Sequence, residues 1–150
     1  MDSMYRNIAI VLGVLIVGVG AYFALSVFSG PAQDIPERED FGQAVPPNFP
    51  TDIPIEAGAQ VEQSYGLNEQ TGSEQLTIVF VSGKSVKENY DLYLSFLKDG
   101  EWDVLNTHED PALSALYGTK EQYDINVTIS EYSSSGIVAS QVSISVLKKI

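Results

Sequence analysis

The sequence predicts an α+β protein, in which an apolar transmembrane helix and a proline-rich linker precede a small antiparallel sheet with one helix packed on one face. Three observations lead to this prediction. Residues 8–28 are an uncharged apolar run of 21 residues. Six of the seven prolines lie between Pro31 and Pro54. Beyond residue 57, segments with alternating apolar residues surround one segment with helical spacing, in the order β-β-α-β-β-β-β.

The apolar run is long enough to cross a membrane. As a helix, residues 8–28 extend about 31 Å, close to the roughly 30 Å of a hydrocarbon core. A secretory signal has a shorter apolar region of about 7–15 residues. Length therefore favours a retained anchor. Cleavage is the alternative, because Ala24-Leu25-Ser26 has the small residues that a signal peptidase accepts.

The residues that flank the run predict its orientation. Arg6 and the amino group precede it, and no basic cluster follows it. The positive-inside rule then places residues 1–7 in the cytoplasm and the carboxy-terminal domain outside it. We expect an integral, single-pass protein of the cell membrane.

Small residues fall close to one face of the predicted membrane helix. They are Ala9, Gly13, Gly20 and Ala24. Small residues on a common face let two helices approach each other, which makes this face a candidate homodimer contact. Gly and Ala are also common in membrane helices that have no partner, so both interpretations stay open.

Residues 29–56 are predicted to form the linker. They show no hydrophobic periodicity, and proline fixes φ and disfavours helix in the residue before it. We expect an extended tether of polyproline II type, about 60 Å long over some twenty residues. Phe49 and Ile53 interrupt its polar character, and we expect them to dock on the domain that follows. A recognition motif for an outside partner is the alternative.

Residues 57–150 are predicted to form the extracytoplasmic domain, which begins with two strands. Residues 60–65 alternate between polar and apolar side chains. Residues 75–82 alternate as well and place Leu76, Ile78 and Phe80 on one face. The turn-rich stretch between them connects the two strands.

One helix follows these strands. Ser85 and Glu88 have the spacing of a capping box, and Gly100 occupies the place of a left-handed C-terminal cap. An apolar stripe repeats at helical spacing between them. Its members are Val86, Tyr90, Tyr93, Leu94 and Leu97.

A meander of strands completes the domain. Strands are predicted over residues 102–107, 113–118, 123–130 and 138–147. The second is ambiguous, because Asp110-Pro111 also allows one capped helical turn; the alternation of its apolar residues favours a strand. The last strand points Val142, Ile144 and Val146 inward. One helix lying across one face of such a sheet buries both apolar surfaces.

Three short stretches carry a resemblance to a family. They are PPNFPTDIPIEAGAQV (residues 46–61), Y-x-x-Y-L (90–94) and GEWDV (100–104). In these the chain resembles small, mostly uncharacterised prokaryotic envelope proteins, which share a P-x-x-F-P-x-D-[IVL]-P approach, a Gly-Ala strand start and a G-W-x-V strand. The resemblance implies an envelope location and an α+β fold, and no activity. This chain lacks the lipobox cysteine and carries Glu101 between the Gly and the Trp.

Composition argues against several classes of function. The net charge is −12, and a surface of that sign repels nucleic acid. The chain has no cysteine, hence no disulfide, thiolate nucleophile or Cys-ligated metal. The single histidine, His108, has no second histidine as partner, and residues 99–110 depart from a calcium loop at its sixth and twelfth positions. Nucleophile-elbow and phosphate-loop motifs are missing. We expect no enzyme, no metal and no cofactor.

Two hypotheses about function are left. The first is a membrane-anchored extracytoplasmic module that acts by protein contact as part of an envelope complex. The alternative is a domain that binds a small ligand or a cell-wall glycan through an aromatic sheet face or a cleft beside the helix. Its candidate residues are Tyr65, Tyr117, Tyr123 and Tyr132. Tyrosines clustered on one exposed face favour the alternative, and a flat polar sheet favours the first.

Overall fold

The computed structural model describes residues 36–68, 72–134 and 137–150. The predicted membrane helix and its candidate dimer contact lie outside these residues. That contact comprises Ala9, Gly13, Gly20 and Ala24. In the part of the chain that is described, no helix is both long and apolar enough to span a membrane.

Seven strands and one helix make up the described part. They are β1 (Glu37–Asp40), β2 (Gln60–Asn68), β3 (Glu74–Ser82), α2 (Val86–Asp99), β4 (Asp103–His108), β5 (Leu113–Lys120), β6 (Tyr123–Ser134) and β7 (Ile137–Lys148). From Gln60 onward the order is β-β-α-β-β-β-β, as predicted. The ambiguous stretch 113–118 is strand, within β5. The architecture is α+β, which confirms the predicted class for this part of the chain.

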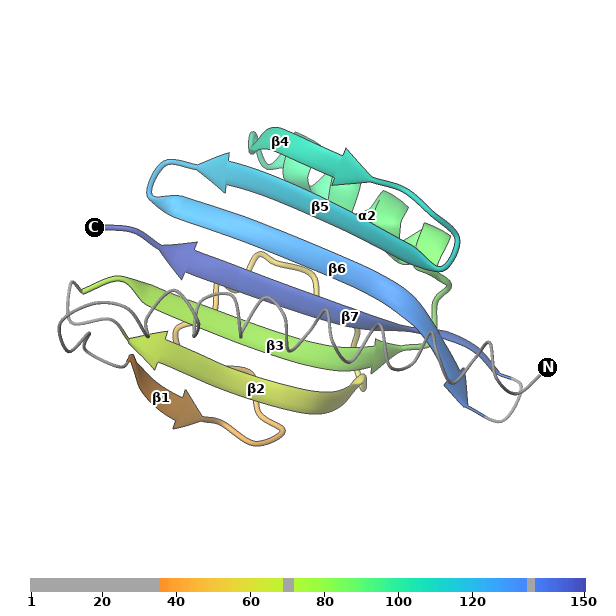
Figure 1. Cartoon of the computed structure of the whole chain (residues 1–150), viewed down its shortest axis with the longest axis horizontal. Coiled ribbons are helices and arrows are strands. Elements are labelled where there is room, and N and C mark those ends of the chain that lie inside the picture. The colour runs from red at the N-terminus through yellow and green to blue at the C-terminus, as the bar shows by residue number, and fades with distance from the viewer. Residues whose placement is uncertain (1–35, 69–71, 135–136) are drawn as a thin grey trace, which may run out of the picture. The chain divides into compact units, whose positions relative to one another are not determined.

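The strands form one antiparallel sheet in the order β1-β2-β3-β7-β6-β5-β4 (Figure 1). Helix α2 carries the chain from β3 to the far edge, where β4 begins. The meander then returns strand by strand until β7 pairs with β3, with Ile78 opposite Ile144. The first and last parts of the domain therefore meet in the middle of the sheet, and β1 and β4 are its edges.

Only one face of the sheet is apolar, and we call it the inner face. It carries Leu76, Ile78 and Phe80 of β3 together with Val142, Ile144 and Val146 of β7, all buried as predicted. The alternate residues of β6 and β5 continue it with Ile125, Val127, Ile129 and Leu116. Period-two alternation therefore delivers one continuous core surface across four strands.

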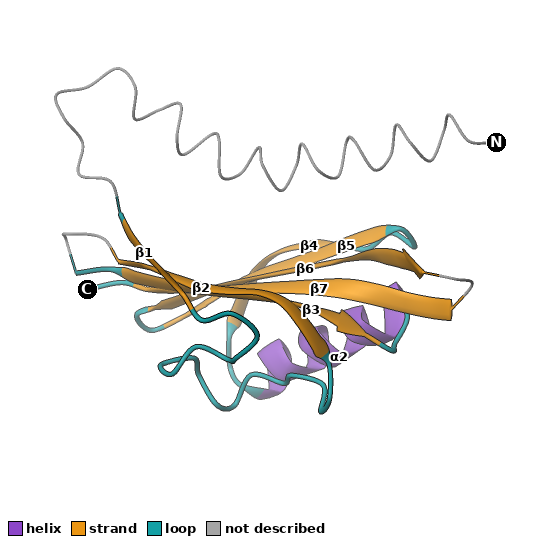
Figure 2. Cartoon of the chain, turned by 90° about the horizontal axis from the view of Figure 1, so that it is seen from below, coloured by secondary structure: helices purple, strands orange, loops and turns teal. Residues whose placement is uncertain are grey.

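Two elements lie on the inner face, as Figure 2 shows. Helix α2 packs on β4 to β7 with its stripe of Val86, Tyr90, Tyr93 and Leu97. Residues 41–56, which we call the approach segment, add Phe49 and Ile53, each only 4% exposed. The expected docking of these two residues is confirmed. Residues 37–40, within the stretch predicted as a tether, form β1 on β2.

The ends of α2 show one confirmed and one wrong prediction. The Ser85–Glu88 capping box is present. At the other end Gly100 has φ −82°, and Glu101 takes the left-handed conformation with φ 59°. The Trp102 N–H donates to the Leu97 carbonyl at 2.9 Å, and the Glu101 N–H donates to the Lys98 carbonyl at 3.2 Å. These two bonds form a Schellman motif in which Glu101 is the C′ residue. Gly100 is needed for space, since a Cβ there would lie 2.9 Å from the Phe96 carbonyl oxygen.

Candidate functional site

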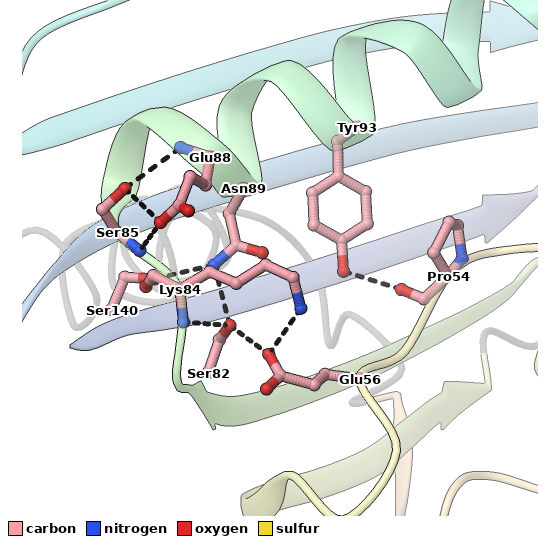
Figure 3. A network of polar contacts seen from close by, with 9 residues as sticks. All are labelled: Pro54, Glu56, Ser82, Lys84, Ser85, Glu88, Asn89, Tyr93 and Ser140. Atoms are coloured by element: carbon pink, nitrogen blue, oxygen red, sulfur yellow. Dashed lines mark hydrogen bonds and ion pairs between the residues drawn. The ribbon is translucent and has the colours of Figure 1, made fainter. Parts of the chain in front are cut away.

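A buried polar network joins α2, β3, β7 and the approach segment (Figure 3). The Asn89 side-chain amide donates to the hydroxyls of Ser82 at 2.9 Å and Ser140 at 2.8 Å. The Ser82 hydroxyl donates to the Glu56 carboxylate, and that of Ser140 donates to the Lys84 carbonyl at 2.9 Å. The Lys84 ammonium lies 3.2 Å from the same Glu56 oxygen.

The serine hydroxyls of the network are closed to a substrate, whereas Glu56 and Lys84 are partly exposed. The hydrogen bond from Ser82 lowers the pKa of Glu56 most; the Lys84 charge lowers it further, and burial opposes both. A serine bonded to a carboxylate invites a catalytic interpretation, but Ser82 is fully buried, as is Ser140. Both hydroxyls also accept from Asn89. We therefore assign this network to packing.

The four candidate tyrosines lie in different places. Tyr65 and Tyr117 lie on the outer face, opposite the helix, in the same cross-strand row. Tyr132 lies six residues along β6 from the row, opposite Ala139, and both residues line the cleft at the N-terminus of α2 that is described below. Tyr123 lies on the inner face against the core. Its alternation with the buried Ile125 was the sequence signal for this position.

The row that joins Tyr65 to Tyr117 crosses the sheet through uncharged polar side chains. Its members in order are Tyr65, Thr77, Ser145, Asn126 and Tyr117. The hydroxyls of Thr77 and Ser145 are 2.9 Å apart, so neighbouring strands are linked by side chains as well as by the backbone. At one end of the row the Arg38 guanidinium lies 4.0 Å from the centre of the Tyr65 ring.

The next row on the outer face is also uncharged. Together the two rows form a surface that we call the outer patch, made of Thr77, Val79, Ser143, Ser145, Asn126, Thr128, Ala115 and Tyr117. No described helix or strand covers it (Figure 2). In a chain with net charge −12, four adjacent strands therefore carry a neutral surface, in which Asn126 is exposed, Ser143 and Ser145 are half-buried, and Thr77 and Val79 are buried.

A cleft of about 730 Å³ lies at the N-terminus of α2. Its lining includes three carboxylates, those of Glu109, Asp110 and Glu131, together with Lys87. The Lys87 ammonium lies 3.4 Å from Glu109 and also pairs with Asp91. The hydrogen bond to Asp91 raises the pKa of Lys87 most, and Glu109 adds to that rise. One ammonium shared among these acids leaves the cleft negative.

Sequence reasoning offered a cleft beside the helix but missed its acidic lining, because only strand pairing brings Glu131 to Glu109 and Asp110. The Glu131 N–H donates to the Ala112 carbonyl at 3.0 Å, which holds β6 against the loop before β5. His108 was expected in a loop; it is the exposed last residue of β4. Among the residues that the structure describes, no three His, Cys, Asp or Glu side chains converge as a metal site.

No family model, curated protein or solved structure matches the chain. The resemblance to prokaryotic envelope proteins therefore stays a prediction.

Proposed function

We propose that the chain is a single-pass, membrane-anchored module outside the cytoplasm, without enzymatic activity, that acts by protein contact within an envelope complex. The apolar run 8–28 supports the anchor. The observation that carries the contact function is the outer patch. Protein interfaces are depleted of charge at their centres, and this patch is uncharged in a strongly acidic chain.

The outer patch supplies the centre of such a contact. Strands lie about 4.8 Å apart and rise about 3.4 Å per residue, so four strands and two rows span roughly 14 Å by roughly 7 Å. A standard interface buries about 800 Å² per partner, so most of the contact area has to come from residues around the patch.

The test is co-purification from detergent-solubilised native membranes. The full chain is compared with an Asn126→Lys/Ser143→Lys variant, which places two charges in the patch. Gln122→Lys, exposed in the turn before β6, is the matched control. We expect a partner to be retained by the parent chain and the control and to fall at least tenfold with the variant. A partner equally retained by the variant would remove the patch from the proposal, and the lack of any partner would contradict contact function altogether.

The location is tested separately. Protease treatment of intact cells is expected to digest the bulk of residues 57–150, and fractionation is expected to recover the chain with the membrane. Recovery of a trimmed chain in the aqueous fraction contradicts the anchor.

A neutral cell-wall glycan is the second candidate ligand, bound on the outer patch together with Tyr65 beside it. The observation that favours it is the row with Tyr65 and Tyr117 at its ends and hydrogen-bonding side chains between them. Sugar rings stack on aromatic faces. Sedimentation with insoluble cell-wall polysaccharide distinguishes the two, because only the glycan hypothesis expects binding that Tyr117→Ala reduces at least tenfold.

A further inference from the structure

The two edges of the sheet differ in chemistry. β1 has four residues, Glu37, Arg38, Glu39 and Asp40, all charged and all exposed. Short length and charge are the usual means by which an edge strand avoids pairing with another chain. β4, at the opposite edge, has six residues. Its four middle residues are uncharged, namely Val104, Leu105, Asn106 and Thr107.

β4 also presents an apolar side chain to solvent. The pairing with β5 shifts between Val104 and Asn106, so Leu105 is the extra residue of a bulge and is 61% exposed. Bulges often turn an edge away from pairing. Here the bulge exposes a leucine where β1 has only charges, and the strand is regular again from Asn106 to His108. This arrangement offers a partner both backbone and apolar contact.

The outward backbone groups of β4 are available. In an antiparallel strand, alternate residues direct their N–H and C=O groups away from the neighbouring strand. Within residues 36–68, 72–134 and 137–150, no backbone group outside β5 forms a hydrogen bond with the backbone of residues 103–108. An added strand would satisfy these groups.

Charge identifies the kind of strand that fits. The neutral stretch lies between Glu101 and Asp103 on one side and Glu109 and Asp110 on the other, all exposed. The acidic cleft with Glu131 continues from the second group. A second copy of β4 would bring acids opposite acids in an antiparallel pair, which is unfavourable. A segment with a neutral centre and basic ends matches both parts of the edge.

We propose that β4 is a docking edge for an extended segment of a partner protein, which adds as an eighth strand with uncharged residues in its centre and Lys or Arg at its ends. Main-chain hydrogen bonds supply affinity in this mode, and side chains supply selectivity. The inference rests on the proposed function in requiring a protein partner, but it uses a surface separate from the outer patch.

The test uses amide hydrogen exchange of the full chain in mild detergent. The probe is a ten-residue peptide of alternating Val and Thr with two lysines at each end. At saturation we expect outward amides of residues 104–108 to exchange at least tenfold more slowly and those of β1 to stay unchanged. Two control peptides, one with Glu in place of Lys and one with prolines at the central Val positions, are expected to give no protection.

Three results of this measurement overturn the proposal. They are protection that is absent, protection equal in β1, and protection given equally by the acidic peptide. Protection of β4 without peptide that grows with protein concentration points instead to a second copy as occupant, and contradicts the proposed partner.

Proline variants test the edge itself. Asn106 and Thr107 are neighbours, so one of them directs its N–H outward, and proline is tolerated there. Asn106→Pro and Thr107→Pro are both made, and the one that keeps the parental melting temperature identifies the outward position. That variant is expected to bind the peptide at least tenfold more weakly. It is also expected to retain the protein partner in the co-purification test of the outer patch, which contains Asn126 and Ser143. Unchanged peptide binding overturns the docking edge and leaves the proposed function standing.

The last variants test whether the acidic residues at the two ends of β4 attract the basic ends of the peptide. Asp103→Asn and Glu109→Gln are each expected to weaken the basic peptide about two- to fivefold, the range for exposed ion pairs, and to reduce the salt dependence of binding. Peptide affinity that neither salt nor these variants change contradicts the basic ends of the proposed partner.

Discussion

Helix α2 and the approach segment cover the same face of one sheet, and they are held in place by opposite means. The helix forms its own backbone hydrogen bonds and carries its own capping box. The approach segment has only isolated turns, such as the Phe49 N–H to the Pro46 carbonyl at 3.0 Å. Its position depends on Phe49, Ile53 and the contacts of Glu56 and Pro54 with residues far along the chain.

The difference shows that a core layer does not need regular secondary structure. A helix contributes a stripe of apolar side chains because its period is 3.6 residues. An irregular segment contributes the same burial when two large apolar side chains insert and the polar backbone is satisfied by long-range partners. Substitutions in both layers and at the end of the helix test this comparison.

Phe49→Ala is expected to have the largest effect. It should destabilise the domain by about 3–5 kcal/mol, because a fully packed aromatic ring leaves a cavity. Leu97→Ala, in the helix, is expected to cost about 2–5 kcal/mol. Urea denaturation followed by Trp102 fluorescence measures both. Val45→Ala, in the same segment but 45% exposed, is the control and should change stability by less than about 0.5 kcal/mol. If Phe49→Ala lowers the free energy of unfolding as little as the control does, the approach segment is a tether and not part of the core.

Glu56→Ala removes the contacts that the approach segment makes with Ser82 at the end of β3 and with Lys84 in the loop before α2. We expect a loss of about 1.5 kcal/mol at pH 7, since hydrogen bonds to charged groups are worth about 1.5–3 kcal/mol. The folded-state pKa of Glu56 lies below its ordinary value of 4.5. Its stabilisation is therefore present above that ordinary value and is lost as the pH falls through the lowered one.

The pH dependence can be measured with urea midpoints at pH 7, 5 and 3. The gap between the parent chain and Glu56→Ala should be widest at pH 7 and should close towards pH 3. Glu37→Ala, which removes an exposed carboxylate of β1, should run parallel to the parent throughout. A gap that widens on acidification contradicts the assigned ion pair.

Tyr93→Phe tests the one hydrogen bond that runs directly from the helix to the approach segment. The Tyr93 hydroxyl donates to the Pro54 carbonyl at 2.7 Å. Burial raises the pKa of Tyr93, and the Glu56 charge adds to the rise, so the hydroxyl stays a donor. We expect a cost of about 1 kcal/mol. In Tyr90→Phe the lost hydroxyl has no partner in the approach segment, and the cost should be smaller. Equal costs would show that the bond to Pro54 stabilises nothing.

Glu101→Gly has the smallest expected effect, and it is stabilising. Glu101 is in the left-handed region with φ 59°. Relief of this conformation is worth about 1–2 kcal/mol, and the greater freedom of glycine in the unfolded chain cancels part of it, which leaves about 0.5–1 kcal/mol. Gly100→Ala should destabilise, because its Cβ meets the Phe96 carbonyl. A higher urea midpoint for Gly100→Ala would overturn the assignment of the cap.

Sequence patterns predicted the elements that carry a local period. The alternation in β3, β6 and β7, the helical stripe and the capping box each follow from backbone geometry over a few residues. β1 was missed, because Glu37 to Asp40 have no apolar alternation and become a strand only by pairing with β2. The cap was placed one residue early, because glycine is the usual left-handed residue and here it serves close packing.

The candidate site was less predictable than the fold. Tyr65 and Tyr117 share a row only because β3, β7 and β6 lie between β2 and β5 in a given register. Glu131 reaches the acidic cleft for the same reason. The neutral centre of β4 was visible in the sequence, but its place at an edge was not.

By itself, then, the sequence determined the apolar run, the acidic balance, the types of element and which residues of each strand turn inward, since all of these depend on neighbours within a few positions. The tertiary structure alone decided the strand order, the two edges, the outer patch and the docking of the approach segment. Pairing between residues up to 79 apart, as between Gln141 and Glu62, leaves no mark on local spacing. It is settled by which arrangement buries all the inward side chains at once.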